Sequence, residues 1–210
     1  MKKHLLFFVS AIFFLGLTSS SQVFSKRDKL FGATAGLSFS SDNNIPANPY
    51  PYQHSNNIAF MPSFAWAIKS NLAMGIKGNF TYSKWVLKGT TQKYVNTSLE
   101  TGPEIFLRKY KALKDRFGVF FNHGLDLHYR KNTTQNNQNK ITSTVWGGGY
   151  NFTPGAFYKF SNRFLGEASF GGLNVQYSKN NEGTKSFNAG INFLNYFNVG
   201  IQYIIPGKKS

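Results

Sequence analysis

The sequence predicts an all-β fold: a transmembrane, antiparallel up-and-down β-barrel of about eight strands, preceded by a signal peptide. Three observations predict it. The chain opens with an export signal, apolar residues alternate with small or polar residues along successive segments, and short connections alternate with long ones. A chain of 210 residues without an evident internal boundary is expected to form one domain.

Residues 1–21 have the pattern of a secretory signal peptide. A basic start is followed by an apolar run from Leu5 to Leu17 and then by small residues. The run is shorter than the roughly 20 residues of a membrane helix, although an uncleaved anchor is the alternative. We therefore expect residues 22–210 to be the mature barrel domain, beginning at Gln22.

Composition narrows the partners of an exported chain. The absence of cysteine excludes disulfides, thiol catalysis and a lipid-modified N-terminal cysteine. The net charge is +16, or +14 once Lys2 and Lys3 leave with the signal. Because an exported chain rarely meets nucleic acid, we expect none as a partner, and the positive charge indicates anionic lipids and lipopolysaccharide. A solvated basic rim that only aids solubility is the alternative.

The first four strands are expected at 31–39, 58–68, 72–82 and 95–108. The third has the clearest alternation, with apolar Leu72, Met74 and Ile76 on one face and small or polar residues on the other. The apolar positions of the others, in the same order, are Phe31, Ala33, Ala35, Leu37 and Phe39; Ile58, Phe60, Phe64, Trp66 and Ile68; Val95, Leu99, Ile105 and Leu107.

The last four strands are expected at 117–130, 144–160, 164–178 and 187–205. Three of them alternate regularly, with Phe117, Leu125 and Leu127; Trp146, Tyr150 and Tyr158; and Phe187, Phe197, Val199 and Ile201 among their apolar positions. In 164–178 the apolar parity changes after Phe170, so we expect a bulge at Gly171–Gly172. Asn195 interrupts the apolar parity of the last strand and indicates another bulge.

Connection lengths predict the orientation. Lys-Ser-Asn, Lys-Tyr-Lys-Ala-Leu-Lys-Asp and Ser-Asn-Arg form short turns, whereas residues 40–57, 83–94, 131–143 and 179–186 form longer polar loops. Outer-membrane barrels keep short turns in the periplasm and long loops outside. We therefore expect a barrel in the cell outer membrane with both termini in the periplasm.

Three prolines lie within predicted strands on the outward parity. Pro62, Pro103 and Pro154 each precede an apolar alternation and then a short turn, which forms a weak internal repeat. A proline removes a ladder hydrogen bond and is unfavourable inside a closed sheet. We interpret Pro62 and Pro154 as bulges near the outer interface.

Aromatic residues near the strand ends favour a membrane barrel over the alternative, a soluble exported β-sandwich. They are expected to form two interfacial girdles. The main candidates are Trp66, Tyr82, Trp85, Tyr129, Trp146 and Tyr158, with Tyr110, Phe160 and Tyr177 as further members.

The small, polar parity carries charges that would face the lumen. The expected network comprises Lys77, Glu100, Glu104, Arg108, Asp126 and Glu167, with Lys159 as a further candidate. Because an eight-stranded barrel has just enough room for its own side chains, we expect a filled lumen with paired charges. A gated ion path is the alternative.

Basic residues cluster near the short turns, where lipid phosphates would meet them. The candidates are Lys69, Lys109, Lys111, Lys114, Arg116 and Arg163. At the other end, lysines such as Lys84, Lys131 and Lys179 would meet lipopolysaccharide phosphates.

No catalytic, metal or cofactor motif stands out. His123 has the lipid-facing parity, but the sequence around it lacks the serine that barrel lipid-A deacylases use, so a bulge or an interfacial depth is the simpler interpretation. His54 and His128 lack metal-ligand spacing. We expect neither catalysis nor a cofactor, with a lipid-modifying barrel enzyme as the alternative.

The chain resembles the small outer-membrane β-barrel proteins of the Bacteroidota, similar to OmpA- and OmpX-type barrels. The resemblance spans residues 22–205 and is carried by the signal ending Ser-Ser-Ser-Gln, the proline hairpins and the closing segment Phe-Asn-Val-Gly-Ile-Gln-Tyr-Ile-Ile. It implies the fold, the location and insertion by the barrel-assembly machinery. We expect a structural or binding role, possible envelope protein partners and no enzymatic activity; a narrow channel and a secretion-machine accessory are further alternatives.

Overall fold

The computed structural model describes residues 22–43, 52–89, 93–136 and 139–208, so the expected signal peptide lies outside the described residues. Eight strands account for most of the described chain. They are β1 (Lys29–Asn43), β2 (Tyr52–Lys69), β3 (Leu72–Lys88), β4 (Lys93–Ala112), β5 (Phe117–Gln135), β6 (Lys140–Lys159), β7 (Phe164–Asn180) and β8 (Lys185–Ile205). No helix in these ranges has the length and hydropathy needed to cross a membrane.

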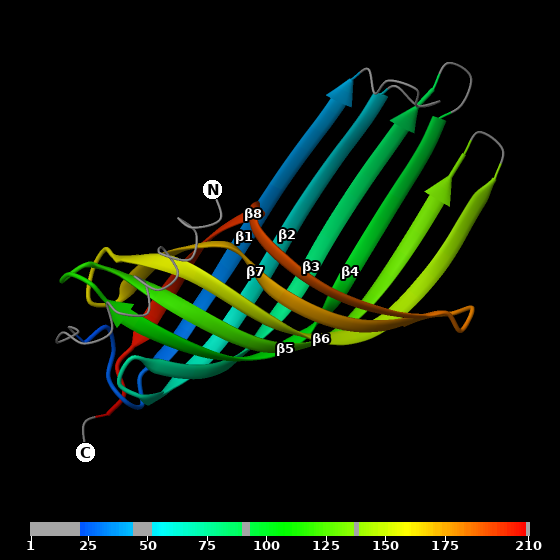
Figure 1. Ribbon diagram of the computed structural model, residues 1–210. Helices are drawn as coiled ribbons and strands as arrows, with labels where there is room; N and C mark the ends of the chain where they lie inside the picture. The colour runs from blue at the N-terminus through cyan, green and yellow to red at the C-terminus, as the bar shows by residue number, and fades with distance from the viewer. Residues whose placement is uncertain (1–21, 44–51, 90–92, 137–138, 209–210) are drawn as a thin grey trace, which may run out of the picture.

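The strands form one closed barrel in which each strand pairs antiparallel with its neighbours in sequence (Figure 1). The ring closes where β1 pairs with β8, from Lys29 opposite Ile205 to Gly36 opposite Asn198. Every strand thus has two neighbours along part of its length, which satisfies backbone groups within the sheet. The predicted eight-stranded up-and-down barrel is confirmed.

Alternation along the strands separates an apolar exterior from a lumen. On β5, Leu125 and Leu127 are both 66% exposed, whereas the intervening Asp126 is buried. The same parity holds on β4, where Ile105 is exposed between buried Glu104 and Phe106. The exterior therefore carries the aliphatic and aromatic side chains, as the sequence pattern predicts.

The strands are longer than predicted, and the loops are correspondingly shorter. β4 runs from Lys93 to Ala112, which leaves only residues 113–116 between it and β5. Much of the expected loops 40–57, 83–94, 131–143 and 179–186 is strand. Beyond the apolar belt both faces of a strand contact water, so apolar and polar residues no longer alternate in the sequence. A polar segment can therefore still be a paired strand.

The predicted bulge in β7 is confirmed. The registers of β7 with β6 and with β8 both shift next to Gly171 and Gly172, whose φ angles are 52° and 154°. On β8 the shift leaves residues 193–196 without β7 partners between Asn192 and Phe197. The second irregularity predicted near Asn195 therefore lies in this stretch, whose side chains are outside the described set.

Each strand proline interrupts one ladder. Pro62 pairs with Ala33 on β1 but has no partner on β3, and Pro103 pairs with Gly78 on β3 but has none on β5. At these two positions the register continues unchanged, so the bulge interpretation is wrong at Pro62. At Pro154 the β6–β7 register shifts, but the extra residue belongs to β7, so Pro154 lies opposite the β7 bulge. A proline lacks the amide hydrogen that the sheet pairing needs. Each proline therefore stays paired with one neighbouring strand and leaves a gap only in the pairing with the other.

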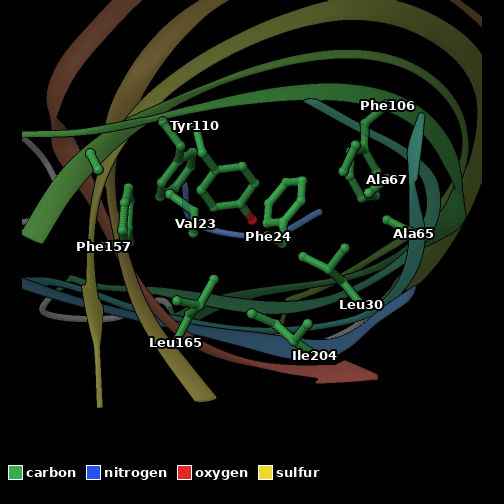
Figure 2. Close-up of a cluster of buried hydrophobic side chains, with 13 residues drawn as sticks. Val23, Phe24, Leu30, Ala65, Ala67, Phe106, Tyr110, Phe157, Leu165 and Ile204 are labelled. Carbon is green, nitrogen blue, oxygen red and sulfur yellow. The ribbon is translucent and has the colours of Figure 1, made fainter. Parts of the chain in front are cut away.

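The end of the lumen near the short turns is filled by an apolar core (Figure 2). Residues 22–28 enter this end and bury Val23 and Phe24. The Phe24 ring meets the Tyr110 ring edge-on at 5.1 Å, and Tyr110 contacts Phe157 at 5.5 Å. The remaining members of the core are Leu30, Ala65, Ala67, Ala73, Phe106, Ala112, Phe120, Leu165 and Ile204.

Candidate functional site

Four of the predicted lumen charges form two ion pairs above this apolar core. Lys77 Nζ is 2.9 Å from Glu104 Oε2, and Arg108 Nη1 is 2.6 Å from Glu167 Oε2. Asn122 joins the two pairs, because it accepts a hydrogen bond from Arg108 Nε and donates one to Glu104. Alternation places all these side chains in the lumen, and each buried charge has an opposite charge beside it.

Glu167 is the centre of the larger cluster. Besides Arg108, it accepts hydrogen bonds from the Tyr110 hydroxyl and from the Gln202 amide. The Arg108 guanidinium also lies about 5 Å from the ring centres of Phe106 and Phe120. Four strands, β4, β5, β7 and β8, are thereby tied together across the lumen.

The other predicted charges pair outside the predicted set. Asp126 contacts His128 Nδ1 at 2.8 Å and accepts a hydrogen bond from Asn151. Glu100 pairs with Arg130, with Oε2 2.6 Å from the guanidinium Nε. His128 and Arg130 share the inward parity of Asp126 on β5, and this parity is the sequence signal that the prediction left unused.

Lys159 lies at the end of β6 nearest the short turns, and none of the ion pairs among the described residues includes it. The charged layer formed by the Lys77–Glu104 and Arg108–Glu167 pairs therefore does not include Lys159.

The lumen is not filled above the charged layer. A cavity of about 620 Å³ lies there, and a second of about 250 Å³ reaches down to Lys77, Arg108 and Glu167. Thr81, Glu100, Asn151, Thr153, Gln176 and Asn198 line both. The expectation of a filled lumen is thus wrong for the half near the long loops, because the inward side chains there are mostly short and polar.

Two aromatic residues expected at the membrane interface face inward instead. Trp85 lines the 620 Å³ cavity together with Thr81 and Ser83, on the parity opposite to Tyr82. Tyr110 is buried in the lumen core. The number of residues from a turn predicts how deep a side chain lies along the barrel axis. Alternation along the strand decides whether that side chain faces the lumen or the exterior.

The other interfacial candidates lie on the exterior of the barrel. Trp146 is 66% exposed, and its ring contacts that of Tyr129 at 4.6 Å. Tyr158 contacts Phe160 near the short turns. Trp66 and Tyr82 are also outward and exposed.

His123 lies on the exterior, and the β4–β5 and β5–β6 registers are regular around it, so a bulge is excluded. Its Nδ1 lies 2.7 Å from the Tyr150 hydroxyl, and its ring contacts Phe152. A hydrogen-bonded partner lowers the cost of a polar ring on an apolar surface.

The predicted phosphate-binding side chains gather at the short-turn end. Lys69 is the last residue of β2, and Lys109 and Lys111 lie near the end of β4. The connections 113–116 and 160–163 carry the remaining three. Those are Lys114, Arg116 and Arg163, all exposed. Within the described ranges no group of three or more His, Asp or Glu side chains is arranged to hold a metal.

A closed antiparallel barrel with an apolar exterior and a polar, charge-bearing lumen has the architecture of a transmembrane β-barrel. Several solved barrels are similar in shape. OprG from Pseudomonas aeruginosa is 13% identical, with 89% of this chain and 100% of that chain covered and a TM-score of 0.49. The N-terminal β-barrel domain of OprF from the same organism is 13% identical, with 86% and 98% covered and a TM-score of 0.38. Neisserial surface protein A is 12% identical, with 84% and 96% covered and a TM-score of 0.39.

No protein-family model matches the sequence, and no curated protein matches it significantly. At 12–13% identity, the similarity to these solved barrels concerns the fold alone.

Proposed function

We propose that this protein is an outer-membrane β-barrel of the Bacteroidota type with a structural and binding role, and that it neither conducts ions nor catalyses a reaction. The observation that carries the proposal is the closure of the lumen at one end. Phe24 and Tyr110 lie within it, directly below the Arg108–Glu167 pair. An ion crossing the barrel would have to displace both layers.

The end that carries the short turns is assigned to the periplasm. Both Lys29, where β1 begins, and Ile205, where β8 ends, lie there and pair with each other. Insertion by the barrel-assembly machinery then leaves the 620 Å³ cavity facing outward. Envelope molecules outside the cell would thus have access to the cavity.

Basic side chains at the periplasmic rim support an anchoring role toward lipid phosphates. Lys114 and Arg116 are exposed in the turn between β4 and β5, and Arg163 is exposed in the next short turn. Phosphates of the inner leaflet would meet these cations, and lysines at the opposite rim would meet lipopolysaccharide.

Two measurements on the purified, folded protein test the proposal. The unboiled protein should migrate differently from the boiled protein on a gel, and it should show no steady conductance in planar bilayers. Open-channel conductance would overturn the sealed-lumen role. Recovery of the mature chain in the soluble fraction without detergent would overturn the membrane location.

A further inference from the structure

The barrel wall is incomplete between β1 and β8. β1 pairs with β2 along its whole length, from Lys29 to Asn43, but with β8 only from Lys29 to Gly36. Within the described pairings, residues 37–43 of β1 and 185–197 of β8 have no partner across this seam. Figure 1 shows the two strands diverging beyond the point where their pairing ends.

An irregularity between β7 and β8, with three extra residues on β8, accounts for the divergence of β8 from β1. At Gly171–Gly172 the β7–β8 register jumps, so that Phe170 opposite Phe197 is followed by Gly172 opposite Asn192. Extra residues on one strand bend a sheet locally. The outer halves of β7 and β8 thereby turn away from β1 as a hairpin.

The opening begins within the apolar belt. The first unpaired residues, Leu37 and Phe197, face outward and are 60% and 53% exposed. Farther along β8, Phe187 and Ile191 are also outward and exposed. Acyl chains rather than water therefore meet the edges of the opening.

The 620 Å³ cavity reaches the point where this seam opens. Its lining includes Asn198, the last β8 residue paired with β1, together with Gly171 and Gly172 at the bulge. A volume of this size is typical of a small-molecule site, which ranges over roughly 300–1,000 Å³. The cavity thus reaches the inner side of the wall where the pairing of β1 with β8 ends.

The chemistry of the lining selects a neutral, hydroxyl-rich group. Asparagine, glutamine, serine and threonine side chains both donate and accept hydrogen bonds, as sugar hydroxyls require. The charged residues of the lining, Glu100 and Arg130, neutralise each other. Trp85 adds an aromatic face on which the C–H side of a sugar ring can pack.

We propose that the cavity binds a glycolipid-type amphiphile: a neutral sugar head group lies among the amides beside Trp85, and its alkyl chain leaves between β1 and β8 into the outer leaflet. This inference rests on the proposed outer-membrane location. It adds a class of ligand and a lateral route into the membrane. A barrel in which β1 and β8 paired along their whole length would not provide that route.

The first test uses engineered disulfides, since the chain has no native cysteine. Ala35→Cys with Val199→Cys joins two residues that pair across the seam. Leu37→Cys with Phe197→Cys joins the two residues that follow the last pair, Gly36 and Asn198, on the same face. A disulfide needs Cα atoms roughly 4.4–6.8 Å apart. The first variant should crosslink in the folded barrel and the second should not.

The second test measures binding in lipid nanodiscs free of detergent. Trp66→Phe with Trp146→Phe leaves Trp85 as the single tryptophan. Dodecyl maltoside, added below its micellar concentration, should shift Trp85 emission saturably, whereas dodecylphosphocholine and maltose should not.

Neighbouring asparagines provide a matched control. Asn57 lines the cavity, whereas Asn56 alternates to the other face of β2. Asn57→Leu should weaken the dodecyl maltoside response about two- to tenfold, as expected for a lost hydrogen bond, and Asn56→Leu should leave it unchanged.

The alternative outcomes separate this inference from the proposed function. Efficient crosslinking of both disulfide variants would mean a closed seam, and a Leu37→Cys disulfide dimer would mean that a second copy covers the edge; either result overturns the lateral route. An equal response to maltose or to dodecylphosphocholine overturns the ligand class. Failure of the Ala35–Val199 crosslink would instead contradict the barrel closure on which the proposed function stands.

Discussion

Arg108 and Glu167 meet across the lumen, with Nη1 2.6 Å from Oε2, although their strands β4 and β7 are not neighbours in the barrel. The pair therefore bridges opposite walls. The Tyr110 hydroxyl and the Gln202 amide also bind Glu167, so that one carboxylate fixes the spacing of several strands. This layer separates the apolar core below from the polar cavities above.

Loss of the Glu167 charge is expected to be costly. Glu167→Gln keeps the volume but leaves the Arg108 charge buried without its counterion, which typically costs ~3–5 kcal/mol in unfolding free energy. Urea unfolding of the barrel in lipid vesicles, followed by tryptophan fluorescence, measures the change. Glu182→Gln, in the exposed turn after β7, is the control and should stay within ~0.5 kcal/mol. Equal stabilities of the two variants would contradict the role assigned to the pair.

Phe24 is expected to hold the N-terminal segment inside the barrel. Phe24→Ala removes a buried ring, at a cost of ~3–5 kcal/mol, so that residues 22–28 undock more often. Trypsin cleavage after the exposed Lys26 or Arg27 should then accelerate by about 100-fold or more. Phe160→Ala, which shortens an exposed exterior ring, should leave the cleavage rate unchanged. An unchanged rate in the Phe24 variant would show that the segment is held by other contacts.

Gly172 is expected to tolerate no side chain. Its φ of 154° disfavours other residues, and an added Cβ would meet the Phe152 carbonyl oxygen. Gly183 also has a positive φ, 88°, but open space surrounds it. Gly172→Ala should therefore lower the urea midpoint of unfolding more than Gly183→Ala does. The reverse order would mean that the bulge adapts to the added methyl group.

Trp85 and Trp146 are expected to respond to opposite quenchers. Trp146 faces outward, so phospholipids with brominated acyl chains should quench it, whereas Trp85 in the lumen should be quenched by iodide from the aqueous side. Single-tryptophan variants reconstituted in vesicles report each residue separately. Strong quenching of Trp85 by brominated chains alone would place it on the exterior and contradict its position in the cavity.

The sequence by itself determined the barrel, because a period of two residues with one apolar parity specifies which face of each strand meets lipid. It also located the β7 bulge, since the change of parity after Phe170 has no other simple cause in a strand. The inward parity of Lys77, Glu104, Arg108 and Glu167 followed from the same pattern.

Only the tertiary structure decided which of these inward residues meet. Arg108 and Glu167 lie on strands separated by two others, and the tilt of the strands and the stagger of their register set the height at which each side chain crosses the lumen. Closure likewise drew Phe24 into the barrel end and left β1 and β8 apart beyond Gly36. Alternation is a local property of one strand, whereas register around a ring depends on all eight strands together.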